Sequence, residues 1–187
     1  MLVIGNGESR KGIDIGLYKG TKIGCNAIYR DFSVDHLICC DKRMVIEAQS
    51  NGYKGTIYTR KDWLGQLKGV ELVPQLPYNG ASRPDDPWHW GSGPYAVLLA
   101  ARLSNGYVDM IGFDLHSDTP NINNVYKDTL NYDKSNKRAI DPSYWIYQIG
   151  KIIQHFPEVV FRNYNKNIWP DKYNNLKNYD IGVFNVS

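Results

Sequence analysis

Short apolar runs alternate with polar or helix-forming stretches along most of the chain. The runs have the length and the β-branched or aliphatic content of buried strands, and most of them end in polar or turn-forming residues. They cover residues 2–4, 21–26, 36–41, 55–59, 107–114 and 159–161, with a less regular run at 70–74. Alternation of such strands with helices or connections predicts a mostly parallel α/β sheet.

Helical patterns fall between these strands. Residues 42–49 have apolar positions at helical spacing and are followed by an Asn-Gly stop signal. Residues 95–103 are apolar on nearly every side, which indicates a buried helix over the sheet, with Ser92 as its N-cap and Pro94 in its first turn. A third helix is expected over residues 143–155. The chain is therefore predicted to form one Rossmann-like α/β domain over residues 1–187, with helices on both faces of the sheet.

Three segments follow neither pattern. Residues 75–91 contain three prolines and an Asn-Gly turn, and their aromatic residues favour either a lid beside a ligand site or a loop packed onto the core by its tryptophans. Residues 115–140 are polar and rich in Asn and Asp, so they form either a second lid-like flap or a surface loop. Residues 163–187 are rich in Asn, Lys and Tyr and are expected to form a surface-wrapping or partly ordered tail.

Composition narrows the class of protein. A chain of 187 residues with 42% hydrophobic content can bury one core, and a net charge of +3, evenly scattered, is not the footprint of a nucleic-acid-binding protein. The three cysteines lie in strand-like runs and have neither a disulfide framework nor zinc-site spacing. No apolar run approaches the roughly 18 residues of a membrane span. A cytoplasmic protein with reduced core cysteines is expected.

Polar residues end four of the predicted strands, namely Asn6, Asn26, Asp41 and Asp114. Taken singly, each could simply start a turn. Because the carboxyl ends of parallel strands meet at one edge of the sheet, we expect the four side chains to line one crevice there.

Two glycine-containing loops face the same edge. Residues 5–7 read Gly-Asn-Gly, which suits either an ordinary tight turn or a close approach to a ligand, and Ser9 can cap a short helix whose free N–H groups favour an anion. Ser92 and Gly93 begin the apolar helix and offer a second such site. The chain has no P-loop, and Arg10 replaces the third glycine of the dinucleotide-binding fingerprint. A P-loop ATPase and a standard NAD dehydrogenase are therefore disfavoured.

These motifs together resemble the bacterial sialyltransferase family that uses CMP-activated sialic acid. The resemblance covers residues 1 to about 130 and rests on Val-Ile-Gly-Asn-Gly-Glu-Ser at 3–9, Cys-Asn at 25–26 before Tyr29, Ser-Gly at 92–93 and Ile-Gly-Phe-Asp at 111–114. It implies nucleotide-binding roles for Gly5, Asn6, Gly7, Ser9, Asn26, Ser92 and Gly93. It also places Tyr126 near a family tyrosine that contacts the phosphate.

The chain departs from that family at two positions. The family has a histidine as general base before the helix that starts here near Pro142, where this sequence has Lys134, Lys137 and Arg138. The family asparagine after the third strand is replaced by Asp41, which resembles a sister group that includes 6-hydroxymethylpterin pyrophosphokinase-like proteins.

A base for an acceptor hydroxyl must therefore come from elsewhere. His116, beside Asp114 at a strand end, and His89 in the aromatic loop are the candidates, with a purely structural role as the alternative for each.

The sequence thus predicts a nucleotide-sugar-dependent glycosyltransferase that acts on a small-molecule or glycan acceptor and requires no cofactor. One alternative is a pyrophosphokinase-like phosphotransferase in which Asp41 and Asp114 hold Mg²⁺. Another is a nucleotide-binding protein without catalysis, which senses or sequesters its ligand.

Overall fold

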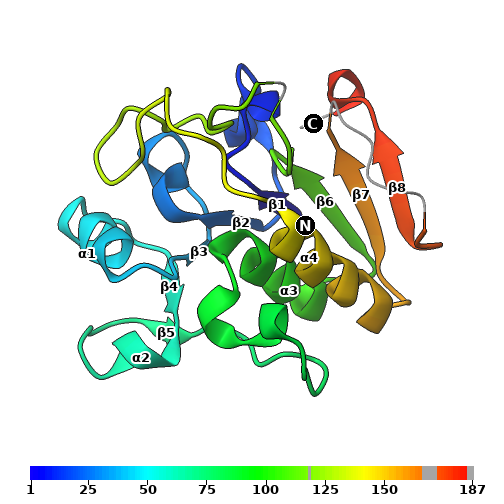
Figure 1. The fold of residues 1–187 in the computed structure, drawn as a ribbon, viewed down its shortest axis with the longest axis horizontal. Coiled ribbons are helices and arrows are strands. Elements are labelled where there is room, and N and C mark those ends of the chain that lie inside the picture. The colour runs from blue at the N-terminus through cyan, green and yellow to red at the C-terminus, as the bar shows by residue number, and fades with distance from the viewer. Residues whose placement is uncertain (118, 166–171, 185–187) are drawn as a thin grey trace.

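A computed structural model of the protein describes residues 1–117, 119–165 and 172–184. It contains an eight-stranded, all-parallel sheet in the order β5-β4-β3-β2-β1-β6-β7-β8 (Figure 1). The strands are β1 (Leu2–Ile4), β2 (Lys22–Cys25), β3 (His36–Ile38), β4 (Thr56–Thr59), β5 (Glu71–Leu72), β6 (Tyr107–Ile111), β7 (Val160–Tyr164) and β8 (Leu176–Tyr179). The predicted single-domain, Rossmann-like α/β class is confirmed.

The strand order reverses at the centre of the sheet. From β1 the chain builds outward through β2 to β5 on one side, and from β6 through β8 on the other. Ile4 of β1 accordingly lies between Gly24 of β2 and Ile111 of β6. In parallel α/β sheets, ligands bind beyond the carboxyl ends of the strands at such a reversal. A ligand site is therefore expected at the edge of the sheet where β1 and β6 end.

Helices cover both faces of the sheet. The helices are α1 (Lys42–Ser50), α2 (Lys61–Leu64), α3 (Ser92–Leu103) and α4 (Ser143–His155). Short 3-10 turns are η1 (Glu8–Arg10), η2 (Ile15–Leu17), η3 (Asn26–Arg30), η4 (Arg83–Asp85), η5 (Pro87–His89) and η6 (Ile181–Val183). Within the described part of the chain, no helix is long and apolar enough to span a membrane.

The core has two layers because strand residues alternate between the faces. Val3 packs on the side of α3 and α4, whereas Leu2 and Ile4 pack on the side of α1 and η3. Figure 1 shows α3 and α4 side by side across the sheet, and α3 contacts both the strands and α4. Because α3 packs against both the sheet and α4, residues 95–103 are apolar on nearly every side of the helix.

Two predicted helix caps differ from the observed ones. The N-cap of α3 is Gly91, with Ser92 as the first helical residue, and η1 begins after Gly7, with Ser9 inside the turn. The hydroxyl of Ser92 instead makes tertiary contacts, because it donates to Asn26 Oδ1 at 2.9 Å and accepts from the Cys40 amide at 3.0 Å. Ser92 therefore ties the start of α3 to the ends of β2 and β3, and Gly91 takes the N-cap position.

Residues 75–91 run along α4. The Tyr78 ring stacks on His155 with centroids 4.8 Å apart, and Gln148 Nε2 donates to the carbonyl oxygens of Pro84 and His89 at 2.8 and 3.0 Å. Trp90, near the end of the segment, is buried. The last residues of this segment lead into α3, which begins at the carboxyl edge of the sheet.

The C-terminal residues include a strand that the sequence pattern does not predict. β8 pairs in parallel with β7, and Leu176 of β8 is buried. The expected tail over residues 163–187 therefore starts inside β7 and contains β8, so that expectation is wrong for these strands. The remainder of it, residues 166–171 and 185–187, lies outside the described residues.

Candidate functional site

The ends of β1 and β6 approach each other through their backbones. The amides of Gly5 and Gly7 donate to the carbonyl oxygens of Ile111 and Gly112, each at 2.8 Å. A methyl group on Gly5 would collide with the Gly112 carbonyl, and Gly112 itself has a φ of +68°. Glycine is required here by the contact between the two strand ends, whether or not a ligand binds.

Asp114 is turned towards η1. Its carboxylate accepts hydrogen bonds from the amide of Ser9 at 3.0 Å and from the Ser9 hydroxyl, and it is 7% exposed. It also lies so close to Gly7 that a methyl group there would collide with it. An internal carboxylate thus occupies the position at η1 that the sequence assigns to an anionic ligand.

The start of α3 has open donors. Pro94 has no N–H, and the first helical bond runs from the amide of Tyr95 to the Gly91 carbonyl at 3.3 Å. The amides of Ser92 and Gly93 make no hydrogen bond within the described residues. Two free N–H groups at the positive end of a helix of 12 residues can bind an anion.

Asn6 and Asn26 lie beside this helix start. Asn26 adopts a φ of +52° and receives the Ser92 hydroxyl on its side-chain oxygen. Asn6 Nδ2 donates to the Cys25 carbonyl at 3.1 Å, next to Asn26, while Asn6 Oδ1 is buried without a hydrogen-bond partner among the described residues. Asn6, Asn26, Ser92 and Gly93 are thereby brought together over the ends of β1 and β2.

The side chain of Asp41, the neighbour of Cys40, is directed to solvent. It is 63% exposed and forms a 3.7 Å ion pair with Arg43. β3 and β6 are separated by β2 and β1, so the strand ends that carry Asp41 and Asp114 are about 14 Å apart. One Mg²⁺ with oxygen ligands at about 2 Å cannot be held by both carboxylates.

The four strand-end side chains therefore do not line one crevice. Asn6 and Asn26 meet at the start of α3, Asp114 turns to η1, and Asp41 faces solvent. Among the described residues, no group of three or more His, Cys, Asp or Glu side chains is arranged to hold a metal ion.

Tyr126 is buried instead of facing an open ligand site. Its hydroxyl donates to Asp31 at 2.6 Å and accepts from Arg10 Nη2 at 3.0 Å, and the residue is 5% exposed. Burial, together with the bond to Asp31, raises the pKa of Tyr126 well above its ordinary value. Arg10 Nε also donates to the Gly5 carbonyl at 2.9 Å. Tyr126 therefore stabilises the turn formed by residues 5–10 through its hydrogen bond with Arg10.

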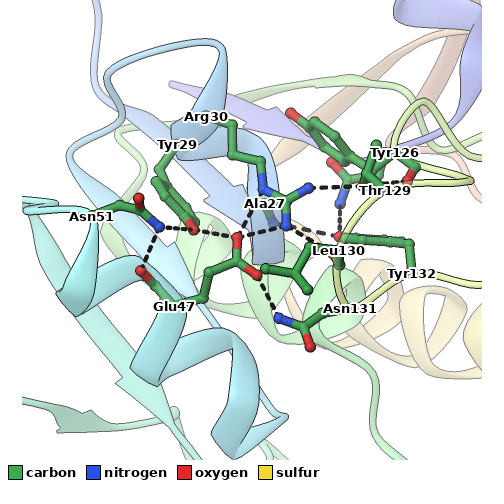
Figure 2. A network of polar contacts seen from close by, with 11 residues as sticks. Ala27, Tyr29, Arg30, Glu47, Asn51, Tyr126, Thr129, Leu130, Asn131 and Tyr132 are labelled. Carbon is green, nitrogen blue, oxygen red and sulfur yellow. Dashed lines mark hydrogen bonds and ion pairs between the residues drawn. The ribbon is translucent and has the colours of Figure 1, made fainter.

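Residues 123–132 cross the carboxyl edge and are held there by a polar cluster that the sequence analysis does not identify (Figure 2). The Glu47 carboxylate accepts from Tyr29 at 2.5 Å, from Arg30 Nε at 2.8 Å and from Asn131 at 2.5 Å. Arg30 also donates to Thr129 Oγ1 and to the Leu130 carbonyl, each at 2.8 Å. The only sequence signal for this cluster is an acid on the otherwise apolar face of α1.

The same loop reaches the candidate site. The Tyr132 hydroxyl lies 3.3 Å from Asn6 Nδ2 and 3.4 Å from the amide of Ala27, and the Val125 amide donates to the Asn6 carbonyl at 2.9 Å. The Glu47 cluster therefore fixes the loop whose tyrosine positions Asn6.

A cavity of about 570 Å³ lies beside η1. It is lined by Glu8, Ser9, Asp114, His116, Ser117, Thr119, Asn121, Ile122, Asn123, Lys127, Ser135 and Asn136. His116 Nδ1 lies 2.8 Å from the Asp114 carbonyl oxygen, which can only accept a hydrogen bond, so Nδ1 carries the proton of this contact. The other candidate base, His89, packs edge-on against Tyr144, with ring centroids 5.5 Å apart.

Comparison with protein-family models, curated proteins and solved structures finds no match to this chain. Arguments about its function therefore rest on the chemistry of the site and on the motifs in the sequence.

Proposed function

We propose that this chain binds a nucleotide sugar at the carboxyl edge of β1 and β2 and transfers the glycosyl group to a hydroxyl acceptor. The observation that carries the proposal is the pair of free amides at Ser92 and Gly93, beside the side chains of Asn6 and Asn26. The positive end of α3 favours the phosphate, and the two asparagine amides suit the hydroxyls or base of a nucleoside. The motif resemblance supports the same ligand.

The proposed reaction is an inverting displacement. The acceptor oxygen forms a bond to the anomeric carbon, and the bond from that carbon to the phosphate oxygen breaks, so the nucleotide leaves with the electron pair. The amides at the start of α3 stabilise the charge that grows on the departing phosphate. His116, which lines the cavity beside η1, takes the proton of the acceptor hydroxyl.

A non-catalytic nucleotide-binding protein is the second candidate. The observation that favours it is the segment in which the resembled family carries its histidine base. Here that segment has Lys134, Lys137 and Arg138 instead, and Lys137 is paired with Asp133 at 2.7 Å. Release of free nucleotide from a donor distinguishes the enzyme from a protein that only sequesters its ligand.

The test is calorimetric titration with nucleoside phosphates and nucleotide sugars. We expect Gly93→Asp to abolish binding, because it places a negative charge at the helix start. Gly93→Ala should retain the fold, since the new methyl group would meet the Phe113 ring at an ordinary 3.4 Å. Gly65→Asp is the matched control, because Gly65 is exposed and has open space around it. Wild-type affinity in folded Gly93→Asp, or no binding of any nucleotide by the wild-type protein, would contradict the proposal.

A further inference from the structure

Trp88 is an exposed aromatic side chain with a fixed backbone and an arginine against its ring. It is 62% exposed, lies in the η5 turn after Pro87, and donates its backbone N–H to Asp86 Oδ1 at 3.0 Å. The guanidinium carbon of Arg60 lies 4.4 Å from the ring centroid, and Arg60 Nη1 donates to the Trp88 carbonyl at 3.4 Å. Arg60 thus covers one face of the indole and leaves the other to solvent.

This pair adjoins the start of α3 through Cys40. Arg60 directly follows β4, and its guanidinium also lies over the Trp63 ring at 5.9 Å. Trp63 Nε1 donates to the Cys40 carbonyl at 2.9 Å, and the Cys40 amide donates to the Ser92 hydroxyl at 3.0 Å. Trp88 itself is four residues before Ser92. An exposed ring is therefore linked to the start of α3 by these contacts and by the short stretch of chain that runs from Trp88 to Ser92.

We propose that Trp88 is the stacking platform for the base of the nucleotide whose phosphate meets Ser92 and Gly93. This inference rests on the proposed function and adds a binding partner for the base of the nucleotide. The contact with Arg60 reduces the rotamer freedom that the ring would lose when a ligand stacks on it. Stacking on an aromatic side chain is open to every base, because each base has a π face.

The arginine behind the ring favours a base over a sugar. Arg60 draws electron density of the indole towards its own face, which weakens the attraction of the opposite face for the slightly positive C–H bonds of a sugar. A base is itself a π system and stacks in an offset arrangement without needing an electron-rich partner.

The test compares two ligands that differ only in the base. We expect the wild-type protein to bind at least one ribonucleoside 5′-monophosphate about tenfold more tightly than ribose 5-phosphate. Trp88→Ala should remove this preference while leaving the affinity for ribose 5-phosphate unchanged. Trp88→Phe should retain most of it, because the phenyl ring can still stack on Arg60.

A matched control exists at the amino-terminal ends of the strands, opposite the candidate site. Tyr107, at the start of β6, is 57% exposed and lies under Arg162 at 5.1 Å, so Tyr107→Ala removes a similar exposed ring far from the site. We expect it to keep the base preference.

The outcomes separate the two proposals. A base preference that survives Trp88→Ala, or a wild-type protein that binds both ligands equally, overturns the platform, and the proposed function stands if Gly93→Asp still abolishes binding. A wild-type protein that binds neither ligand overturns both.

Discussion

Glu47 shows how one side chain can set the position of a loop. Its carboxylate, 8% exposed, accepts hydrogen bonds from Tyr29 and Arg30 of η3 and from Asn131 of the loop. Burial by itself raises the pKa of Glu47, but hydrogen bonds from Tyr29, Asn131 and Arg30, with the charge of Arg30, outweigh it and leave the pKa below its ordinary value. The folded state therefore favours the charged form of this acid.

We predict that Glu47→Gln lowers the free energy of unfolding by about 2 kcal/mol at neutral pH. Removing one partner of a buried ion pair leaves the other charge uncompensated, and the 21% exposure of Arg30 keeps the cost below that of a fully buried pair. Urea unfolding gives the value, and Glu158→Gln, at an exposed position, should change it by less than about 0.5 kcal/mol.

The same variant should alter the pH dependence of stability. Because the folded pKa of Glu47 lies below its ordinary value of 4.5, the contribution of the carboxylate is complete above pH 4.5 and is lost as the pH falls through the folded value. The difference between wild type and Glu47→Gln should therefore shrink below pH 4.5. A difference that stays constant down to pH 3 would contradict this assignment of the charge.

Positions along the chain predict which residues share an edge but not where each side chain points. Asn6 and Asn26 could be placed together because both follow strands of one parallel sheet. Asp114 follows a strand too, yet its direction is set by Ser9, which is 105 residues away in the sequence. Tyr126 is similarly fixed by Arg10, 116 residues away. Such partners are chosen by tertiary packing, which no local pattern encodes.

Helices and strands were predictable from the sequence when their apolar and polar residues formed a clear pattern. The helix at α3 has a long apolar run between turn residues, and its existence is confirmed. β8 was missed because only Leu176 of its four residues is buried, while Lys177 and Tyr179 are exposed. A short strand at the edge of the sheet needs few apolar residues, so its sequence looks like that of a polar tail.

Asn175 attaches β8 to the rest of the fold. Its Nδ2 lies 3.0 Å from the carbonyl oxygens of Ile153, Phe156 and Val159, which belong to the end of α4 and the turn that follows it. We predict that Asn175→Ala lowers the free energy of unfolding by roughly 1–2 kcal/mol, because these carbonyls lose a shared donor. Thermal or urea unfolding provides the measurement. Asn174→Ala, at the exposed neighbouring residue, should have little effect, and equal effects of the two variants would show that the contacts do not matter.

At the scale of the whole molecule, the strand order separates Asp41 from Asp114, and each side chain is turned away from the start of α3. Asp114 is bonded to Ser9, and Asp41 is exposed beside Arg43. A carboxylate next to the helix start would repel a phosphate unless a cation lay between them. With these two acids directed elsewhere, the free amides can hold an anion through the helix dipole alone.

The last prediction follows from this separation of charge. A nucleotide at 100 times its dissociation constant should add about 2.7 kcal/mol to the free energy of unfolding, and we expect that gain to persist after EDTA treatment. We also expect Asp41→Asn to retain it, because the exposed Asp41 side chain lies away from the group formed by Asn6, Asn26, Ser92 and Gly93. If chelation and Asp41→Asn each removed the stabilisation, the ligand would require a cation held by Asp41. The phosphotransferase alternative would then be favoured over glycosyl transfer.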